Sequence, residues 1–243
     1  MSKDLVHPVT KMVLPKALRG IENGKLTKDM LVKLDFGGVL YKDAAIAFNA
    51  LYQAAKAAGF ELMNIGDFRP YERQLEMFKD RYSEKDLGRK PQITRNWNGK
   101  TFYLKPGKSP SGTPGTSNHG LGLAIDVGLK VKGKLANLSS SPQAYRWMCE
   151  NAPSYGFYLQ GAPTRPDGKP NPEYEAWHWQ YCLGDKVPPA LKGATPTPVA
   201  TVAEQVPAKP RAAARAEKKQ DRQAKKAARL NKKAQKLENK KKK

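Results

Sequence analysis

Two short segments constrain this chain more than any other part of its sequence. The first, GTSNHGLGLAIDV, spans residues 115–127, and the second, EAWHW, spans residues 175–179. Together they supply two histidines, one aspartate and one glutamate, which are side chains that commonly bind a divalent metal ion. We therefore expect the fold to bring these two distant segments to one place.

The first segment predicts a β-strand over residues 121–127, because side chains alternate between the two faces of a strand. The apolar face, which we expect to be buried, consists of Leu121, Leu123, Ile125 and Val127. The opposite face is nearly bare and consists of Gly120, Gly122, Ala124 and Asp126. In a regular strand the side chain of His119 would point to the face opposite that of Asp126. We therefore expect His119 to come from a loop or from a distorted start of the strand.

The second segment predicts the last strand, over residues 174–181. Glu175 and His178 have opposite parity in such a strand. Both can reach one centre only if the chain bends near Ala176, and we expect such a bend.

This set of residues is typical of a catalytic metal site. Catalytic zinc keeps three protein ligands and one open position, whereas structural zinc has four ligands and is rich in cysteine. The ligand role fits His119, Asp126 and His178. Glu175 fits a carboxylate that removes and returns a proton, and Arg69, at a predicted strand-to-helix junction, fits an oxyanion-stabilising charge.

The remaining pattern predicts an α+β fold, with a mostly antiparallel sheet and flanking helices, because it shows no βαβ repeat. The predicted helices span residues 26–34, 41–58, 71–82 and 141–152. The predicted strands span residues 60–65, 121–127, 155–159 and 174–181. Residues 83–114 form a long excursion with one hairpin arm at 101–104, and residues 161–172 form a loop. Long excursions of this kind are often functional.

Composition divides the chain into four parts: an N-terminal arm or cap at 1–40, the domain with the metal site at 41–184, a Pro/Ala-rich linker at 185–210 and a basic tail at 211–243. Residues 194–243 hold 16 of the 44 basic residues and 4 of the 22 acidic ones. With few apolar residues to bury, we expect the tail to be disordered or partly helical. It would bind polyanions, either teichoic acid or nucleic acid, or it would only improve solubility.

Other features limit the class of protein. No stretch of 18 apolar residues indicates a membrane span, and the N-terminus lacks the pattern of a secretory signal, so we expect a chain that is cytoplasmic at synthesis. Cys149 and Cys182 are too few for a disulfide framework, and both two buried thiols and a single bridge stay open. We expect a monomer.

The two segments also resemble a known family. SNHGLGLAID at 117–126 and EAWHW at 175–179 resemble, in order and spacing, the SxHxxGxAxD and ExWHW signatures of zinc D,D-carboxypeptidases of the VanY type and their phage endolysin relatives. FRPYERQLEMF at 68–78 and CENAPSYGFYL at 149–159 resemble further elements of that family. The resemblance covers about residues 42–184.

The resemblance implies the fold shared by these peptidases and the hedgehog signalling domain. It implies zinc on His119, Asp126 and His178, with Glu175 as general base and Arg69 as the arginine that stabilises the transition state. It also implies that Ser117 lies near the substrate carboxylate.

Three neighbours of Arg69 depart from the family pattern, namely Asp67, Phe68 and Pro70, and they leave its placement open. Gln74 suits a substrate contact and a structural hydrogen bond equally well. Trp177 is expected to form part of the pocket wall.

We therefore expect a zinc metallopeptidase that cleaves the stem peptide of bacterial peptidoglycan, as a D-alanyl-D-alanine carboxypeptidase. It would act on the cell wall, as a phage endolysin released through a membrane hole or after export by another route. The alternatives are an L-alanyl-D-glutamate endopeptidase with the same site, and a noncatalytic zinc- and polyanion-binding module. The presence of Glu175 favours an enzyme, and the excursion at 83–114 is a place where exo or endo cleavage would be decided.

Overall fold

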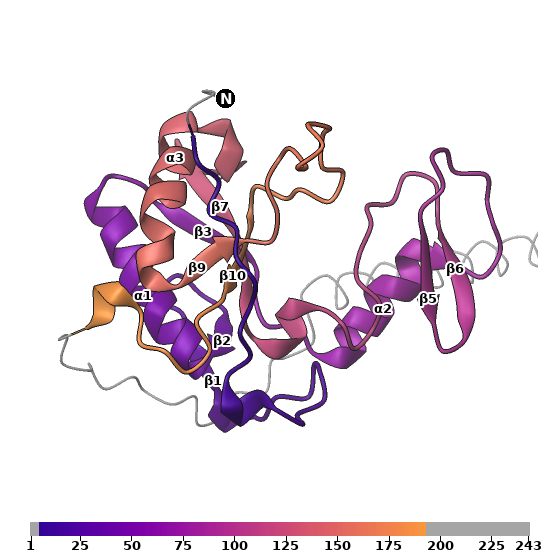
Figure 1. Ribbon diagram of the computed structural model, residues 1–243, viewed down its shortest axis with the longest axis horizontal. Coiled ribbons are helices and arrows are strands. Elements are labelled where there is room, and N and C mark those ends of the chain that lie inside the picture. Colours follow the sequence, from indigo (N-terminus) through magenta and orange to yellow (C-terminus); the bar gives the residue numbers. More distant parts are fainter. Residues whose placement is uncertain (1–4, 193–243) are drawn as a thin grey trace, which may run out of the picture. The chain divides into compact units, whose positions relative to one another are not determined.

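A computed structural model describes residues 5–192 of the chain (Figure 1). Residues 1–4 and 193–243 lie outside the described part. The predicted basic tail and residues 193–210 of the predicted linker therefore fall outside it as well, whereas residues 185–192 are described.

The centre of the fold is a five-stranded sheet in which every neighbouring pair is antiparallel. Its path runs β3 (Leu62–Gly66), β7 (Ala124–Val131), β10 (His178–Tyr181) and β9 (Phe157–Leu159), and β8 (Lys134–Asn137) pairs with β7. The predicted α+β class with a mostly antiparallel sheet is confirmed. Strands β7 and β10, which carry the two sequence signatures, are direct neighbours.

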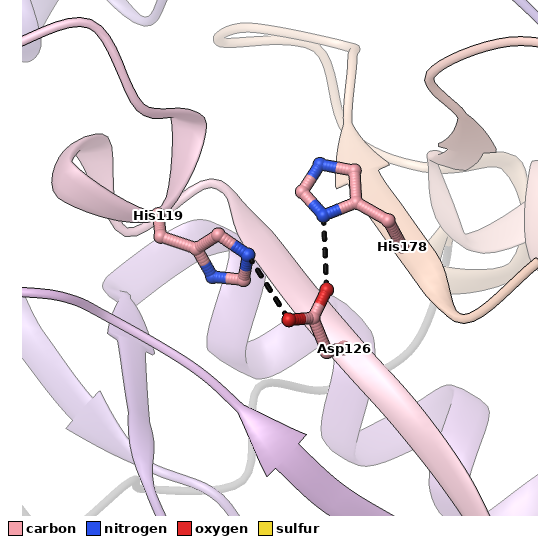
Figure 2. Close-up of side chains that lie close together, drawn as sticks. All are labelled: His119, Asp126 and His178. Carbon is pink, nitrogen blue, oxygen red and sulfur yellow. Dashed lines mark hydrogen bonds and ion pairs between the residues drawn. The ribbon is translucent and has the colours of Figure 1, made fainter. Parts of the chain in front are cut away.

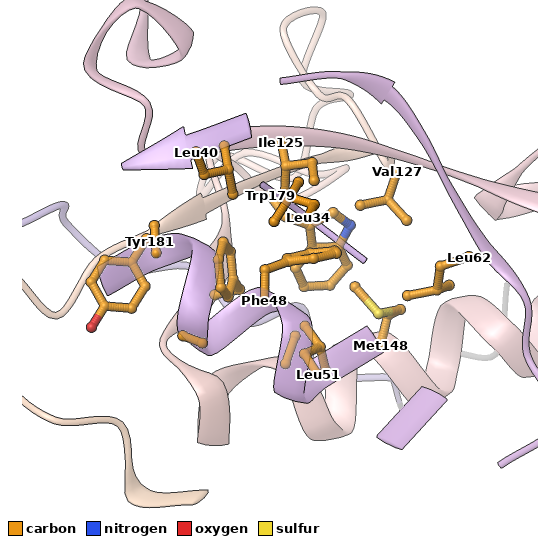
Figure 3. Close-up of a cluster of buried hydrophobic side chains, with 14 of the residues drawn as sticks. Leu34, Leu40, Phe48, Leu51, Leu62, Ile125, Val127, Met148, Trp179 and Tyr181 are labelled. Carbon is orange, nitrogen blue, oxygen red and sulfur yellow. The ribbon is translucent and has the colours of Figure 1, made fainter. Parts of the chain in front are cut away.

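Two helices pack against this sheet, α1 (Lys42–Ala57) and α3 (Pro142–Asn151), as predicted. The apolar face of α1 is fully buried and includes Phe48 and Leu51. Figure 3 shows these side chains packed against Ile125 of β7 and Trp179 of β10. Burying a side chain of this size stabilises the fold by about 1.5–3 kcal/mol, so this core holds β7 and β10 firmly in place.

The N-terminal region differs from its prediction. The helix predicted over residues 26–34 is wrong, because a short 3₁₀ turn (Lys28–Met30) leads into strand β1 (Leu31–Lys33), which pairs with β2 (Val39–Tyr41). A nine-residue helix is marginal by itself, and pairing with β2 buries Leu31 in the main core. Leu18 and Leu26 join the same core, so residues from the segment 5–40 contribute to the main core.

The excursion after helix α2 (Tyr71–Arg81) is ordered rather than structureless. It forms a three-stranded antiparallel sheet in the order β4 (Tyr82–Ser83), β6 (Lys100–Leu104), β5 (Thr94–Trp97). The predicted hairpin arm at 101–104 is thus confirmed as part of β6. This sheet has its own small core of Phe78, Tyr82 and Leu104, and Figure 1 draws β5 and β6 beside α2, away from β7 and β10.

All four predicted strands begin two to four residues later than expected, and β3 begins at Leu62 instead of residue 60. Strand β7 begins at Ala124 instead of residue 121, because Asn118–Leu121 forms a 3₁₀ turn. Strand β10 begins at His178 instead of residue 174, and β9 begins at Phe157 instead of residue 155. Before β7 and β10 the replaced residues form turns, at Asn118–Leu121 and at Ala176 and Trp177.

Both cysteines are free and buried. Of the two possibilities that the sequence left open, the structure therefore shows two buried thiols and not a disulfide bond between them. Burial raises the pKa of Cys149 to about 11 and that of Cys182 to about 12. Within residues 5–192, no helix has the length and apolar composition of a membrane span.

Candidate metal centre and cleft

Three side chains that were predicted as metal ligands converge beside the pairing of β7 with β10, the two inner strands of the main sheet (Figure 2). Asp126 and His178 are cross-strand partners on β7 and β10, and His178 Nδ1 lies 2.9 Å from Asp126 Oδ1. His119 Nε2 approaches the other carboxylate oxygen, Oδ2, at 3.4 Å. The potential ligand atoms of all three residues lie within 4.8 Å of one another.

The 3₁₀ turn before β7 explains how His119 reaches this point despite its parity. Gly122 ends the turn with φ 64°, a left-handed conformation that favours glycine. A Cβ atom there would lie 2.7 Å from the backbone nitrogen of Tyr41, so the position also needs the absence of a side chain. The expectation of a distorted strand start at His119 is confirmed, and the predicted strand face that included Gly120 and Gly122 does not form.

Neighbouring groups fix the His119 ring. Its Nδ1 atom lies 2.9 Å from the carbonyl oxygen of Asp67, and the backbone N–H of Arg69 donates to the carbonyl of His119 at 3.0 Å. Asn23 Nδ2 donates to the Ser117 carbonyl at 2.8 Å at the start of the same turn. A hydrogen bond from Nδ1–H to a backbone carbonyl leaves Nε2 as the ligand atom, which is the usual support of a metal-binding histidine.

The electrostatics of the centre suit a cation. Burial opposes ionisation of Asp126, but hydrogen bonds from His119 and His178 overcome this and hold the pKa of Asp126 below its usual range. Donor atoms about 2.0–2.1 Å from a tetrahedral zinc ion lie roughly 3.3–3.4 Å apart. The 3.4 Å between His119 Nε2 and Asp126 Oδ2 matches this separation, and the 2.9 Å between His178 Nδ1 and Asp126 Oδ1 is shorter. The residues present therefore fit a zinc ion.

Glycine at position 66 leaves space beside the carboxylate. A Cβ atom on Gly66 would lie 2.6 Å from Asp126 Oδ2. Strand β3 thus approaches β7 closely without displacing the ligand oxygen.

Glu175 lies just before β10, exposed at the edge of the centre. The chain turns at Ala176 and Trp177, so Glu175 is not part of the strand, and the predicted bend near Ala176 is confirmed. Partial burial of its carboxyl group raises the pKa of Glu175, while the charges of His178 and Asp126 act on it in opposite directions. A carboxyl group with a raised pKa suits the uptake and return of a proton.

Arg69 lies between β3 and α2, and Gln74 holds it. Arg69 Nη1 donates to Gln74 Oε1 at 2.9 Å, and Gln74 Nε2 donates to the carbonyl of Gly112 at 2.7 Å. Gln74 is only 2% exposed. Of its two predicted roles, the structure supports the structural hydrogen bond, because both ends of its amide are occupied behind Arg69.

A cavity of about 770 Å³ runs along α2 and reaches Asp126, whereas His119, His178 and Glu175 are not among its lining residues. Its lining includes Asp126, Arg69 and side chains of α2. Ser117 and Trp177 are not among its lining residues: both are half-buried, and their carbonyl groups accept backbone hydrogen bonds from Gly120 and Val127 respectively. Their predicted substrate contacts stay predictions.

Sequence reasoning missed several residues of this site. Asp67 acts through its backbone carbonyl, and Asn23 comes from a distant turn, so no local signal marked either of them. Arg73 and Arg81 line the cavity. Their spacing on a predicted helix that follows Arg69 was a signal that could have found them.

Comparison with known proteins adds to this geometry. Residues 38–185 match the family model described as VanY, D-alanyl-D-alanine carboxypeptidase. The chain is 30% identical over 141 residues to the candidate carboxypeptidase YodJ of Bacillus subtilis (strain 168), covering 58% of this chain and 45% of that protein. It spans less than half of the length of the curated relatives that it matches.

Two solved structures are also similar. The LdcB LD-carboxypeptidase is 27% identical, with a TM-score of 0.47, and the match covers 70% of this chain and 75% of that one. A mutant of the vancomycin resistance D,D-pentapeptidase VanY in complex with Zn(II) is 20% identical, with a TM-score of 0.41, and the match covers 73% of this chain and 86% of that one.

Proposed function

This chain belongs to the VanY D-alanyl-D-alanine carboxypeptidase family, and we propose that it is a zinc peptidase that removes the terminal D-alanine from the stem peptide of peptidoglycan. The observation that carries the proposal is the convergence of His119, Asp126 and His178 in one group. Glu175 is close enough for the charges of all three to act on its pKa.

Each residue of the centre has a separate task in this reaction. His119, Asp126 and His178 would hold the metal ion. When bound, zinc supplies a Lewis acid that polarises the substrate carbonyl and makes a water molecule more acidic. Glu175 accepts the proton of the attacking water and delivers it to the departing amine.

Arg69 stabilises the negative charge that develops on the carbonyl oxygen during attack. Its guanidinium group is permanently charged, and Gln74 fixes its direction. A donor that is held in place before the reaction needs no reorganisation in the transition state. The two hydrogen bonds of Gln74 thus support catalysis indirectly.

The bond that is cleaved is tested with defined muropeptides. The zinc-loaded protein is incubated with a stem pentapeptide and, separately, with a tetrapeptide, and the products are identified by mass. Loss of one alanine from the pentapeptide alone is the expected result. Loss of the terminal residue from the tetrapeptide would instead identify an L,D-carboxypeptidase.

Two other outcomes would contradict the proposal. Release of a larger fragment would favour the L-alanyl-D-glutamate endopeptidase with the same site. No product from either peptide, with zinc bound, would favour a noncatalytic zinc-binding module. In that case the polyanion affinity expected of the basic tail would become the main functional candidate.

A further inference from the structure

A β-turn in the N-terminal segment lies between the turn that carries His119 and the start of α2. It consists of residues 22–25 and is closed by the N–H of Lys25, which donates to the carbonyl of Glu22 at 3.0 Å. Gly24, at the third position, has a φ of 85°, a left-handed conformation that favours glycine. Gly24 is buried and Asn23 is half-buried, so the tip of this β-turn packs against the protein.

The β-turn contacts the segment that carries His119. Asn23 Nδ2 donates to the carbonyl of Ser117 at 2.8 Å, and the N–H of Gly24 donates to the carbonyl of Gly120 at 2.7 Å. These two hydrogen bonds lie on either side of His119 in the sequence. A Cβ atom on Gly120 would lie 2.1 Å from Asn23 Oδ1, so the two turns are in close contact.

The same β-turn contacts the start of α2. The carbonyl of Gly24 accepts a hydrogen bond from the N–H of Tyr71 at 3.1 Å. A Cβ atom on Gly24 would lie only 2.4 Å from that nitrogen. Lys25 pairs with Glu72, and its Nζ atom lies 5.1 Å from the centroid of the Tyr71 ring. Tyr71 is the first residue of α2 and follows Arg69 by two positions, so these contacts hold the end of the helix that is next to Arg69.

Gly24 therefore binds one element through its N–H and the other through its carbonyl. Because an unpaired buried backbone group destabilises a protein, both hydrogen bonds oppose a shift of either element. A third hydrogen bond joins the two elements directly, since the N–H of Arg69 donates to the carbonyl of His119 at 3.0 Å. Together these bonds fix the backbone of Arg69 relative to that of His119.

We propose that the Asn23–Gly24 turn positions His119, a metal ligand, relative to Arg69, which stabilises the oxyanion. The metal ion and Arg69 act on the same carbonyl group, and a displacement of about 1 Å in a catalytic site can lower the rate about 100-fold. Neither Asn23 nor Gly24 lines the cavity, so both are positioning residues. They also precede residues 38–185, the segment that the family model matches.

The two halves of this inference differ in what they assume. The half that concerns Arg69 rests on the proposed function. The half that concerns His119 needs only metal binding, so it can be tested without hydrolysis.

Zinc affinity tests the contact with the His119 turn. Wild type, Asn23→Ala and Asn49→Ala are prepared as full chains without metal, and a chelator competes with each for zinc. Asn49 Nδ2 also donates to a backbone carbonyl, that of Lys33 at 3.2 Å, and Asn49 Oδ1 accepts from the N–H of Asp35 at 2.9 Å. Neither partner is a metal ligand, so Asn49→Ala is a matched control for a loss of stability.

We expect Asn23→Ala to bind zinc about tenfold more weakly than wild type, as when the surroundings of a ligand change. Asn49→Ala should bind zinc like wild type, even if its melting temperature is lower. Equal zinc affinity of Asn23→Ala and wild type would overturn the role at His119. An equal loss in both variants would overturn it too, because general destabilisation would then explain the effect.

Amide hydrogen exchange tests whether the two contacts are coupled. In Asn23→Ala the N–H of Tyr71 should exchange faster than in wild type, because its acceptor is the carbonyl of Gly24. Exchange at Tyr71 should be unchanged in Asn49→Ala. If Asn23→Ala also left it unchanged, the contacts with His119 and α2 would be independent, and the coupling would be overturned.

A second pair of variants tests the effect on catalysis. Gly24→Ala places a Cβ atom against the Tyr71 nitrogen, so the start of α2 must shift together with Arg69. Gly20→Ala is the control, because Gly20 has a similar φ of 79°, but a Cβ atom there would meet no atom of residues 5–192 within 4 Å, its chain neighbours aside. With saturating zinc, kcat for the stem pentapeptide should fall about 10- to 100-fold in Gly24→Ala and stay near wild type in Gly20→Ala. Equal kcat values of the two variants would overturn the role at Arg69.

Failure of the proposed function has a different signature. If wild type releases no D-alanine, or if Gly24→Ala does not fold, zinc affinity and exchange at Tyr71 still measure both contacts. Weaker zinc binding together with faster Tyr71 exchange in Asn23→Ala alone would support the inference. A wild-type value of either quantity in Asn23→Ala would overturn it.

Discussion

The two sheets of this protein differ in how they are held. The five-stranded sheet shares one large core with α1, α3 and the N-terminal hairpin, and it carries Asp126 and His178. The three-stranded sheet and α2 share a core of only three fully buried residues. Metal binding needs fixed ligand geometry, whereas a substrate wall can tolerate local opening. We infer that stability is concentrated where the metal is bound.

The largest predicted effect concerns chemistry at the main sheet. Glu175→Gln should lower kcat by about 100- to 10,000-fold, because the proton acceptor is lost. Bound zinc, measured by elemental analysis, should be unchanged, because Glu175 is not one of the three ligands. Glu173→Gln, on the same loop, is the control and should retain near wild-type activity. Loss of zinc from Glu175→Gln would contradict the assignment of Glu175 as the base.

The next effect compares one phenylalanine from each core. Phe48→Ala should destabilise the whole protein by about 3–5 kcal/mol, because it removes a large side chain from the main core. Phe78→Ala should act locally and leave zinc binding intact, because Phe78 belongs to the small core. Hydrogen exchange would then be faster at residues 82–104 alone, and KM would rise. Equal loss of zinc binding in both variants would show that the two regions unfold together.

A smaller effect tests how tightly the main sheet encloses the metal ligands. In Gly66→Ala the new Cβ would lie 2.6 Å from Asp126 Oδ2 if nothing moved. The carboxylate must shift, and zinc affinity should fall about 10- to 100-fold, as is common when the surroundings of a ligand change. Competition with a chelator measures this affinity. Unchanged affinity would mean that the centre adapts easily.

The smallest effect concerns the contact between the two regions. Arg95 Nη2 on β5 lies 3.8 Å from Glu173 Oε1, on the loop that leads to Glu175. Arg95→Gln should change the free energy of unfolding by less than about 1 kcal/mol, and less still at high salt, because exposed ion pairs contribute little. Lys130→Gln, which removes an exposed pair with Glu61, is the control. A much larger effect of Arg95→Gln would show that the loop depends on the hairpin.

The five-stranded sheet and the three-stranded sheet also differ in how much of their structure the sequence predicted. The helices α1, α2 and α3 were predicted from the sequence and are confirmed, and each buries one face. The three metal ligands were predicted from the two signature segments. The bend before His178 was predicted because Glu175 and His178 would point to opposite faces of a regular strand. The start of β7 was not predicted, because Gly122 is held by its approach to Tyr41, a contact between distant parts of the chain.

The small sheet was mostly missed. The turn at Asn98 and Gly99, with φ values of 50° and 73°, is typical of a tight hairpin, but the flanking segments contain few apolar residues. Its strands are stabilised by packing on Phe78 of α2, which no local pattern reveals. Arg81, which lines the cavity, was also missed, although its spacing from Arg73 on the predicted helix was a usable signal.

The central claim is that one zinc ion, bound by His119, Asp126 and His178, enables the release of terminal D-alanine. The most direct measurement is a titration of metal-free protein with zinc while D-alanine release from a stem pentapeptide is followed. Release should be absent without zinc and should rise to a plateau at one zinc ion per chain. Release that does not depend on zinc, or a plateau that Asp126→Ala reaches at the same zinc ratio, would contradict this account.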